Sequence, residues 1–125
     1  MSDYLENEIL DHILGTGAYT MPTTVYVGLS TGSFGDDNSG TELTGNGYAR
    51  QSISFGAAAS GTASNDAAVE FPAATGSWGT VSHFGLFDAS TGGNLLIHGA
   101  LTASKVIETG DILKIAVGDM DITAA

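Results

Sequence analysis

Apolar side chains near the start of the chain recur with the period of an α-helix. The repeating positions are Leu5, Ile9, Leu10, Ile13 and Leu14. Ser2 can cap the first turn, and Gly15 or Gly17 can end the last one, so we predict a helix over residues 2–14. Because a single helix of this length persists only when it is packed against something, we expect residues 1–15 to be a docking segment.

Beyond residue 20 the period changes from about four to two, which is typical of strands. Strands are predicted at residues 24–30, 48–55, 67–71, 80–88, 95–101, 112–117 and 120–123. Gly-, Asn- and Asp-rich loops are predicted at 31–47, 56–66 and 73–79. Helices do not alternate with the strands, so the pairing should be antiparallel. We predict an all-β fold, an antiparallel β-sandwich or jelly roll of residues 20–125 with one short N-terminal helix, in a single domain of residues 1–125.

Two of these strands are apolar on both faces. In residues 80–88, Val81, His83 and Phe87 lie on one face and Phe84 and Leu86 on the other, and residues 95–101 behave alike. Such a strand is central in its sheet or contacts another subunit. Oligomerisation with closed symmetry would cover a second apolar face, so we expect a homo-oligomer.

Charge narrows the classes of partner. Fourteen carboxylates oppose three cationic side chains, Arg50, Lys105 and Lys114, for a formal net charge of -11. This balance argues against binding to nucleic acid and to anionic membranes, because both need clustered Lys and Arg. With no cysteine there are no disulfides, and no signal-peptide pattern is seen, so we expect synthesis in a cytoplasm.

Candidate metal and catalytic groups are scattered. The three histidines, at positions 12, 83 and 98, have no ligand-like spacing. His83 and His98 could pair across the hairpin near Gly92, with Asp88 close by, but hydrogen-bonded strand histidines are the favoured interpretation. The acidic residues 36–42 place hard oxygen ligands together, yet they depart from the EF-hand pattern, which favours a turn over a calcium site.

Other catalytic signatures are missing. Residues 76–79, Gly-Ser-Trp-Gly, lack the spacing of a nucleophile elbow. The glycine pairs at 45–47 and 92–93 precede neither a helix nor a lysine, which excludes a phosphate loop. We therefore predict no enzymatic activity, no cofactor and no metal.

Aromatic side chains lie in or beside the predicted loops and the helix, where they suit either interfaces or the core. They are Tyr4, Tyr19, Tyr26, Phe34, Tyr48 and Trp78.

Several segments together resemble one family. They are residues 21–31 (MPTTVYVGLST), 47–51 (GYARQ), 78–89 (WGTVSHFGLFDA) and 93–96 (GNLL), together with the helix that starts Tyr4-Leu5-Glu6-Asn7. These stretches resemble small virion proteins of tailed phages, which are commonly labelled tail fibre proteins. The resemblance implies β-sandwich modules that serve as capsid cement or decoration proteins, often trimeric, or as distal domains of tail spikes. It implies no catalytic residue, and it places synthesis in a bacterial host.

The position on the virion is left to physical argument. The chain has no repeats and no coiled-coil heptads for a fibre shaft, so we place capsid decoration first. In this hypothesis a trimer on the capsid surface binds the major capsid protein and bridges its subunits. The predicted interface residues are Leu5, Ile9, Ile13, Tyr26, Tyr48, Trp78, His83 and Phe84.

Two alternatives remain. The first is a tail fibre tip that binds a host surface glycan, with Trp78, Asn46 and Tyr48 stacking on and hydrogen-bonding to sugar. The second is a glycan-degrading spike, with acids drawn from Asp36, Asp37, Glu42 and Glu70.

Overall fold

The computed structural model of the protein describes residues 1–123, which form one helix and eight strands. The elements are α1 (Asp3–Leu14), β1 (Val25–Ser30), β2 (Gln51–Ile53), β3 (Thr62–Ser64), β4 (Val69–Glu70), β5 (Gly79–Phe87), β6 (Leu95–Ile107), β7 (Lys114–Ile115) and β8 (Asp121–Thr123). All described strand pairs are antiparallel. The prediction of an all-β fold with one short N-terminal helix is confirmed.

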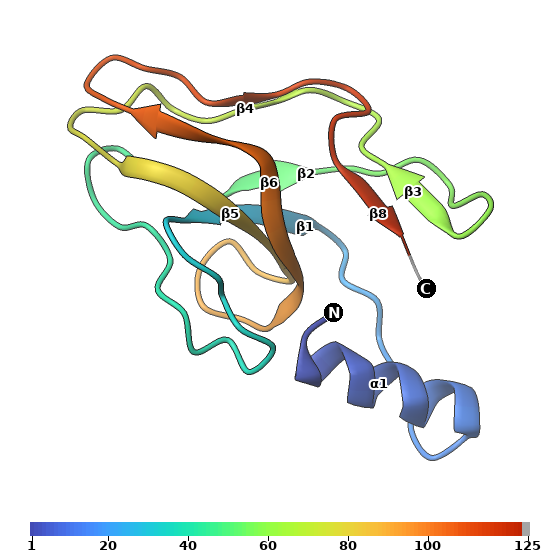
Figure 1. The fold of residues 1–125 in the computed structure, drawn as a ribbon. Coiled ribbons are helices and arrows are strands. Elements are labelled where there is room, and N and C mark those ends of the chain that lie inside the picture. The colour runs from blue at the N-terminus through green and yellow to red at the C-terminus, as the bar shows by residue number, and fades with distance from the viewer. Residues whose placement is uncertain (124–125) are drawn as a thin grey trace.

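The strands form a main sheet and two small ribbons (Figure 1). The sheet has the order β2-β1-β5-β6, and the ribbons are β3-β8 and β4-β7. The main core lies between these layers: Val27, Leu29 and Val81 of the sheet pack in one cluster with Phe71 and Leu113 from the ribbon side. Strand β5 lies between β1 and β6 in the sheet. This agrees with the first of the two explanations offered for its two apolar faces, a central strand.

The second apolar face of the sheet is covered within the same chain. Phe34, from the long loop that follows β1, is 1% exposed and forms a second buried cluster with Phe87 and Leu95. Its ring meets that of Phe87 edge-on, with the centroids 5.6 Å apart. This cluster no longer calls for a partner subunit, because an aromatic side chain of a glycine-rich loop covers Phe87 and Leu95. The homo-oligomer stays a prediction.

Some strand boundaries differ from the predictions. Strand β3 lies inside residues 56–66, which were predicted to be a loop. Its small residues form a strand because they pair with β8. Strand β6 runs on to Ile107, past the predicted end at residue 101. Its register with β5 shifts between Val81 and His83, and this bulge lets the strand continue beyond the point where its alternation breaks down.

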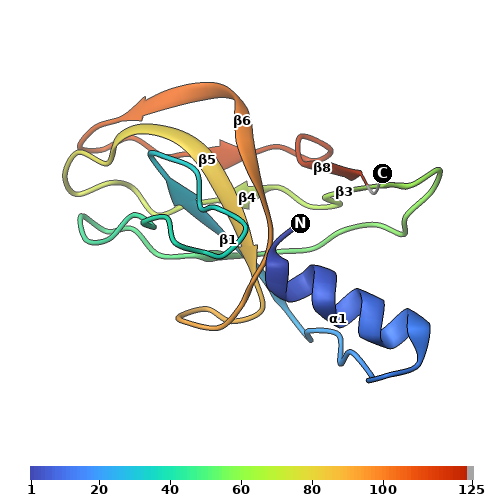
Figure 2. The same ribbon diagram turned by 60° about the horizontal axis from the view of Figure 1, so that its bottom comes forward.

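The helix is formed and capped locally, as predicted. The Ser2 hydroxyl accepts a hydrogen bond from the Leu5 amide, and Gly15 adopts the left-handed conformation (φ 80°) that ends the helix. Of its twelve residues only Leu5 is buried. Figures 1 and 2 both show α1 as a rod that projects from the body of the molecule below the sheet.

Candidate interaction surfaces

The first turn of α1 is fastened to the edge of the sheet by backbone and side-chain hydrogen bonds. The Ser2 amide donates to the Leu96 carbonyl oxygen (2.9 Å), and the Asp3 amide donates to that of Asp36 (2.8 Å). The Ser2 hydroxyl also donates to the Leu95 carbonyl oxygen, and Ser2 is fully buried. The helix therefore starts at a fixed point on β6 and on the loop after β1, while its second half has no such attachment.

Replacing Ser2 with alanine should loosen this attachment. The variant loses the cap on Leu5 and leaves a buried carbonyl without its hydroxyl donor, which should cost about 1–2 kcal/mol. Hydrogen exchange by NMR should show faster exchange of the Leu5 amide, with the core amides of β5 little changed. Ser77→Ala, in an exposed loop, is the control and should leave α1 unchanged. Equal protection of Leu5 in both variants would contradict this role of Ser2.

The second half of α1 carries an exposed apolar face, formed by Leu10, Ile13 and Leu14. These side chains are 55%, 71% and 71% exposed. Glu6 lies in the same row as Leu10 and Leu14, because residues four apart share one side of a helix. Met21, just beyond the helix, is 75% exposed as well. Three neighbouring large apolar side chains on a projecting helix are typical of a contact surface.

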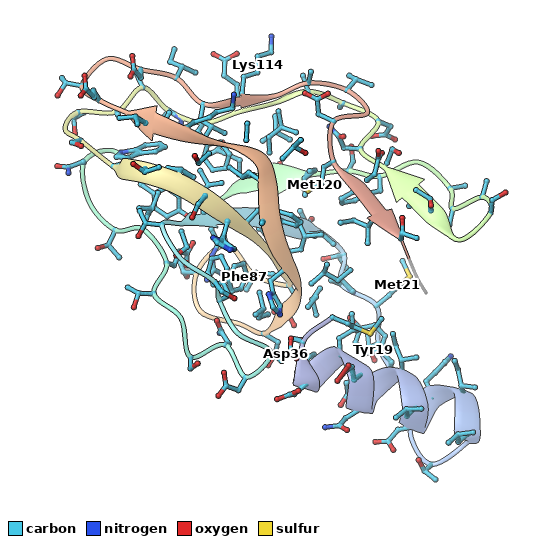
Figure 3. The ribbon with its side chains drawn as sticks, viewed as in Figure 1. Tyr19, Met21, Asp36, Phe87, Lys114 and Met120 are labelled. Carbon is cyan, nitrogen blue, oxygen red and sulfur yellow. The ribbon has the colours of Figure 1, made fainter. Side chains whose placement is uncertain are left out.

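An apolar groove of about 290 Å³ lies between the helix and the sheet. Leu5, Tyr19, Pro22, Val25 and Ile122 are among its lining residues. Figure 3 shows Tyr19 and Met21 on the segment that joins α1 to β1, beside the helix. Among the described residues, no charged side chain lines this groove, so it suits an apolar group.

The eight residues predicted for the interface do not form one surface. Leu5 and Trp78 are buried, and Ile9 is half-buried against the body, whereas Ile13 is largely exposed. The other four residues are half-buried like Ile9, namely Tyr26, Tyr48, His83 and Phe84. The structure brings together the three helix residues and, elsewhere, Tyr48 with Trp78. Leu10 and Leu14, the other members of the helical stripe, are more exposed than Leu5 and Ile9.

Tyr48 and Trp78 belong to a buried aromatic cluster with Phe71. The Tyr48 and Trp78 rings meet edge-on at 5.6 Å between centroids, and the indole nitrogen donates to the Asn46 carbonyl oxygen (2.9 Å). Trp78 is 5% exposed. A sugar cannot stack on the Trp78 ring in this conformation, so the glycan site built from these side chains lacks its central exposed ring.

The Tyr48 hydroxyl is held by hydrogen bonds inside the protein. It donates to Glu42 and accepts from the Leu29 amide (2.9 Å). Burial, and next the hydrogen bond to Glu42, raise the pKa of Tyr48 well above its usual value. The phenol therefore stays protonated across the physiological range and acts as a structural donor.

Arg50 joins this network from the other side, with partners that no sequence pattern marked. Its guanidinium makes a two-pronged ion pair with Glu42 (Nη2 to Oε1 2.8 Å, Nε to Oε2 2.9 Å). Nη1 donates to the carbonyl oxygens of Ala89 (2.9 Å) and Gly92 (2.8 Å), and the guanidinium carbon lies 3.6 Å from the centroid of the Phe87 ring. One of the three cations of the chain thus ties the β5–β6 hairpin to the loop after β1.

The histidines have separate structural contacts. His98 Nε2 lies 2.7 Å from Asp36 Oδ1, His83 Nδ1 lies 2.7 Å from the Ser82 hydroxyl, and His12 Nδ1 accepts from the Tyr19 amide. In the β5–β6 register, His98 stands opposite Gly85 and not opposite His83. Within residues 1–123, no group of three or more acidic, His or Cys side chains is arranged to hold a metal ion.

The acidic loop behaves as a turn. Asp37 Oδ1 accepts from the Ser39 amide (3.1 Å), and hydrogen bonds from Ser39 lower the pKa of Asp37. This is the geometry of an Asx-turn, in which the side chain bonds to the backbone two residues on.

Comparison with known families gives one match. Residues 1–123 match the family described as podophage GP4 fiber I protein gp80. No curated protein matches the chain. In the part of the chain that the structure describes, no helix is long and apolar enough to cross a membrane.

Proposed function

The chain belongs to the podophage GP4 fiber I protein gp80 family, and from this membership we propose that it is a component of a phage tail fibre which joins its neighbours in the particle through α1. It is a structural protein of the phage virion, with a β-sheet fold. The fibre position and the joining role of α1 are the parts proposed here.

The exposed apolar face of α1 carries this proposal. A twelve-residue helix is marginal in water unless its apolar side is packed, and here only Leu5 is buried. The exposed apolar side chains, Leu10, Ile13 and Leu14, project on a helix whose described hydrogen bonds to the body are all at its start. A surface of this kind on a virion structural protein fits an assembly contact better than a catalytic or ligand site.

The family description supports a fibre over the capsid decoration that sequence reasoning placed first. A compact module without its own shaft can still form part of a fibre if copies or other fibre proteins supply the length. Capsid decoration remains the second candidate, because a short module with one docking helix also suits attachment to a shell.

Labelling of intact particles separates these two positions. Antibodies against the purified chain, located by electron microscopy, should bind at the tail fibres only. Labelling spread over the capsid shell would overturn the fibre position and favour decoration.

Replacement of Leu10, Ile13 and Leu14 together by glutamine should remove the chain from particles. Glutamine keeps the helix propensity but removes the apolar contact. We expect incorporation to fall by at least about tenfold, the equivalent of 1.4 kcal/mol, while thermal unfolding of the isolated protein changes little. The matched control replaces Ile112, an exposed apolar residue outside α1, by glutamine. Normal incorporation of the triple variant would contradict the role of α1.

A further inference from the structure

A second groove, of about 460 Å³, lies between β6 and the segment from residue 113 to residue 121. Phe84, Leu101 and Met120 are among the apolar side chains that line it. Lys105 and Lys114 also line it. Apolar and charged side chains thus share the lining of this groove, a mixture that is common at protein–protein interfaces.

The lysines make this groove electrostatically distinct from the rest of the chain. Arg50 is committed to Glu42, so Lys105 and Lys114 are the two remaining cationic side chains, and neither forms an ion pair within residues 1–123. Asp119 and Asp121 also line the groove, so its formal charge sums to zero in a chain whose net charge is -11. A negatively charged partner meets less repulsion here than on a surface of average charge.

The helix α1 has the complementary character. Its carboxylates are Asp3, Glu6, Glu8 and Asp11. Glu6 shares the exposed face with Leu10 and Leu14, so one side of the helix presents apolar groups in line with a carboxylate. This face can therefore pair its apolar side chains with those that line the groove and its carboxylate with a groove lysine.

The α1 helix lies too far from the groove to fill it in its own chain, so a helix bound there must come from another molecule. Figure 3 shows Lys114 at the far end of the protein from α1, and α1 is fastened by its first turn to the start of β6. The surface and its counterpart thus lie on opposite ends of one chain.

We propose that the exposed face of α1 of one copy docks into the β6 groove of the next copy, with Leu10, Ile13 and Leu14 against its apolar lining residues and Glu6 facing Lys105 and Lys114. This inference rests on the proposed function and names the partner of α1 as a second copy of the chain. A cavity of about 150 Å³ holds one benzene ring, so the groove has space for roughly three side chains of that size.

Two other arrangements fit the structure less well. Pairing the exposed faces of two α1 helices would give Glu6 no lysine or arginine partner, because α1 carries neither residue. The apolar groove beside α1 has no charged lining residue to pair with Glu6. A contact between two different surfaces runs head to tail, which builds a ring if it closes and a filament if it does not.

Charge reversal and rescue test this contact in the purified full-length protein. Sedimentation velocity should show self-association of the wild type, and Lys105→Glu should weaken it by at least about tenfold. Adding Glu6→Lys to Lys105→Glu should restore association. Adding Glu8→Lys instead should not, because about 3.6 residues per turn put Glu8 on the other side of the helix. Lys114→Gln gives a second, milder variant that avoids placing an acid opposite Glu70 in the β4–β7 pair.

The outcomes separate this contact from the proposed function. A wild type that associates equally well with Lys105→Glu, or a rescue by Glu8→Lys as strong as that by Glu6→Lys, would overturn the docking mode. A protein that stays monomeric up to about 1 mM would overturn it too, since that affinity is below that of a useful assembly contact. Neither result alters the labelling of tail fibres on the particle, which tests the fibre position separately. Circular dichroism of each variant verifies that it is folded.

Discussion

Replacing Arg50 with alanine is expected to lower the free energy of unfolding by about 3–5 kcal/mol, which is the cost of removing one partner from a buried ion pair. The Arg50 side chain is 8% exposed, and it satisfies Glu42 and two carbonyl oxygens from the β5–β6 turn region. The variant leaves Glu42 with only the Tyr48 hydroxyl as a partner. It also removes the cation above the Phe87 ring, which adds to the loss.

Urea denaturation followed by Trp78 fluorescence measures this effect. Arg50→Lys keeps the charge but cannot reproduce the planar fork, so we expect it to recover only part of the stability. Lys114→Gln removes an exposed cation and should change the free energy of unfolding by less than about 0.5 kcal/mol. A similar small change for Arg50→Ala would show that the network adds little to stability.

Replacing Phe34 with alanine should cost a comparable amount, about 3–5 kcal/mol. Phe34 is the only part of the long loop in the second buried cluster, and its removal opens the apolar side chains of Phe87 and Leu95 to solvent. The backbone around it is tight: a Cβ on Gly40 would lie 2.2 Å from the Ser33 carbonyl oxygen, so the loop cannot easily collapse into the space.

The same variant tests whether this loop holds the helix. Asp36, two residues after Phe34, accepts the hydrogen bond of the Asp3 amide at the start of α1. Hydrogen exchange should therefore show lower protection of Asp3 in Phe34→Ala, together with the lower midpoint of urea unfolding. Thr44→Ala, at an exposed position in the same loop, should change neither. A Phe34→Ala variant with wild-type stability would mean that the second cluster is dispensable.

Arg50→Ala and Phe34→Ala both affect the proposed function, because both disturb the loop that holds the start of α1. The loop after β1 carries Phe34, Asp36 and Glu42, so one segment contacts the second core cluster, the helix and Arg50. A rigid base fixes the direction in which α1 projects, and a fixed direction reduces the entropy lost when the helix docks.

Local interactions made several features of this protein predictable. The Ser2 cap, the Gly15 stop and the four-residue apolar spacing all act within a few residues, so the helix could be placed from sequence and was confirmed. Alternation of apolar and polar side chains is likewise local, and it located β1 and β5 to within a residue or two. The resemblance to phage virion proteins is confirmed by the family match.

Contacts between distant segments decided the rest. Strand β3 exists because β8, nearly sixty residues later, pairs with it, and nothing in its own small polar residues marks it as a strand. Arg50 became a structural centre because the fold brings Glu42, Ala89 and Gly92 to it, from before and after it in the chain. These partners have no regular spacing from Arg50, so no pattern in the sequence predicts them.

The sequence by itself determined an acidic all-β chain with one amphipathic N-terminal helix. The tertiary structure decided which part of the helical stripe packs within the same chain. Leu5 is buried against the body, whereas Leu10, Ile13 and Leu14 remain exposed. The tertiary structure also decided that Phe34 covers the second face of the sheet and that the two lysines share a groove. The physical reason is that periodicity records which side chains are apolar, while their burial depends on which distant segments the folded chain places against them.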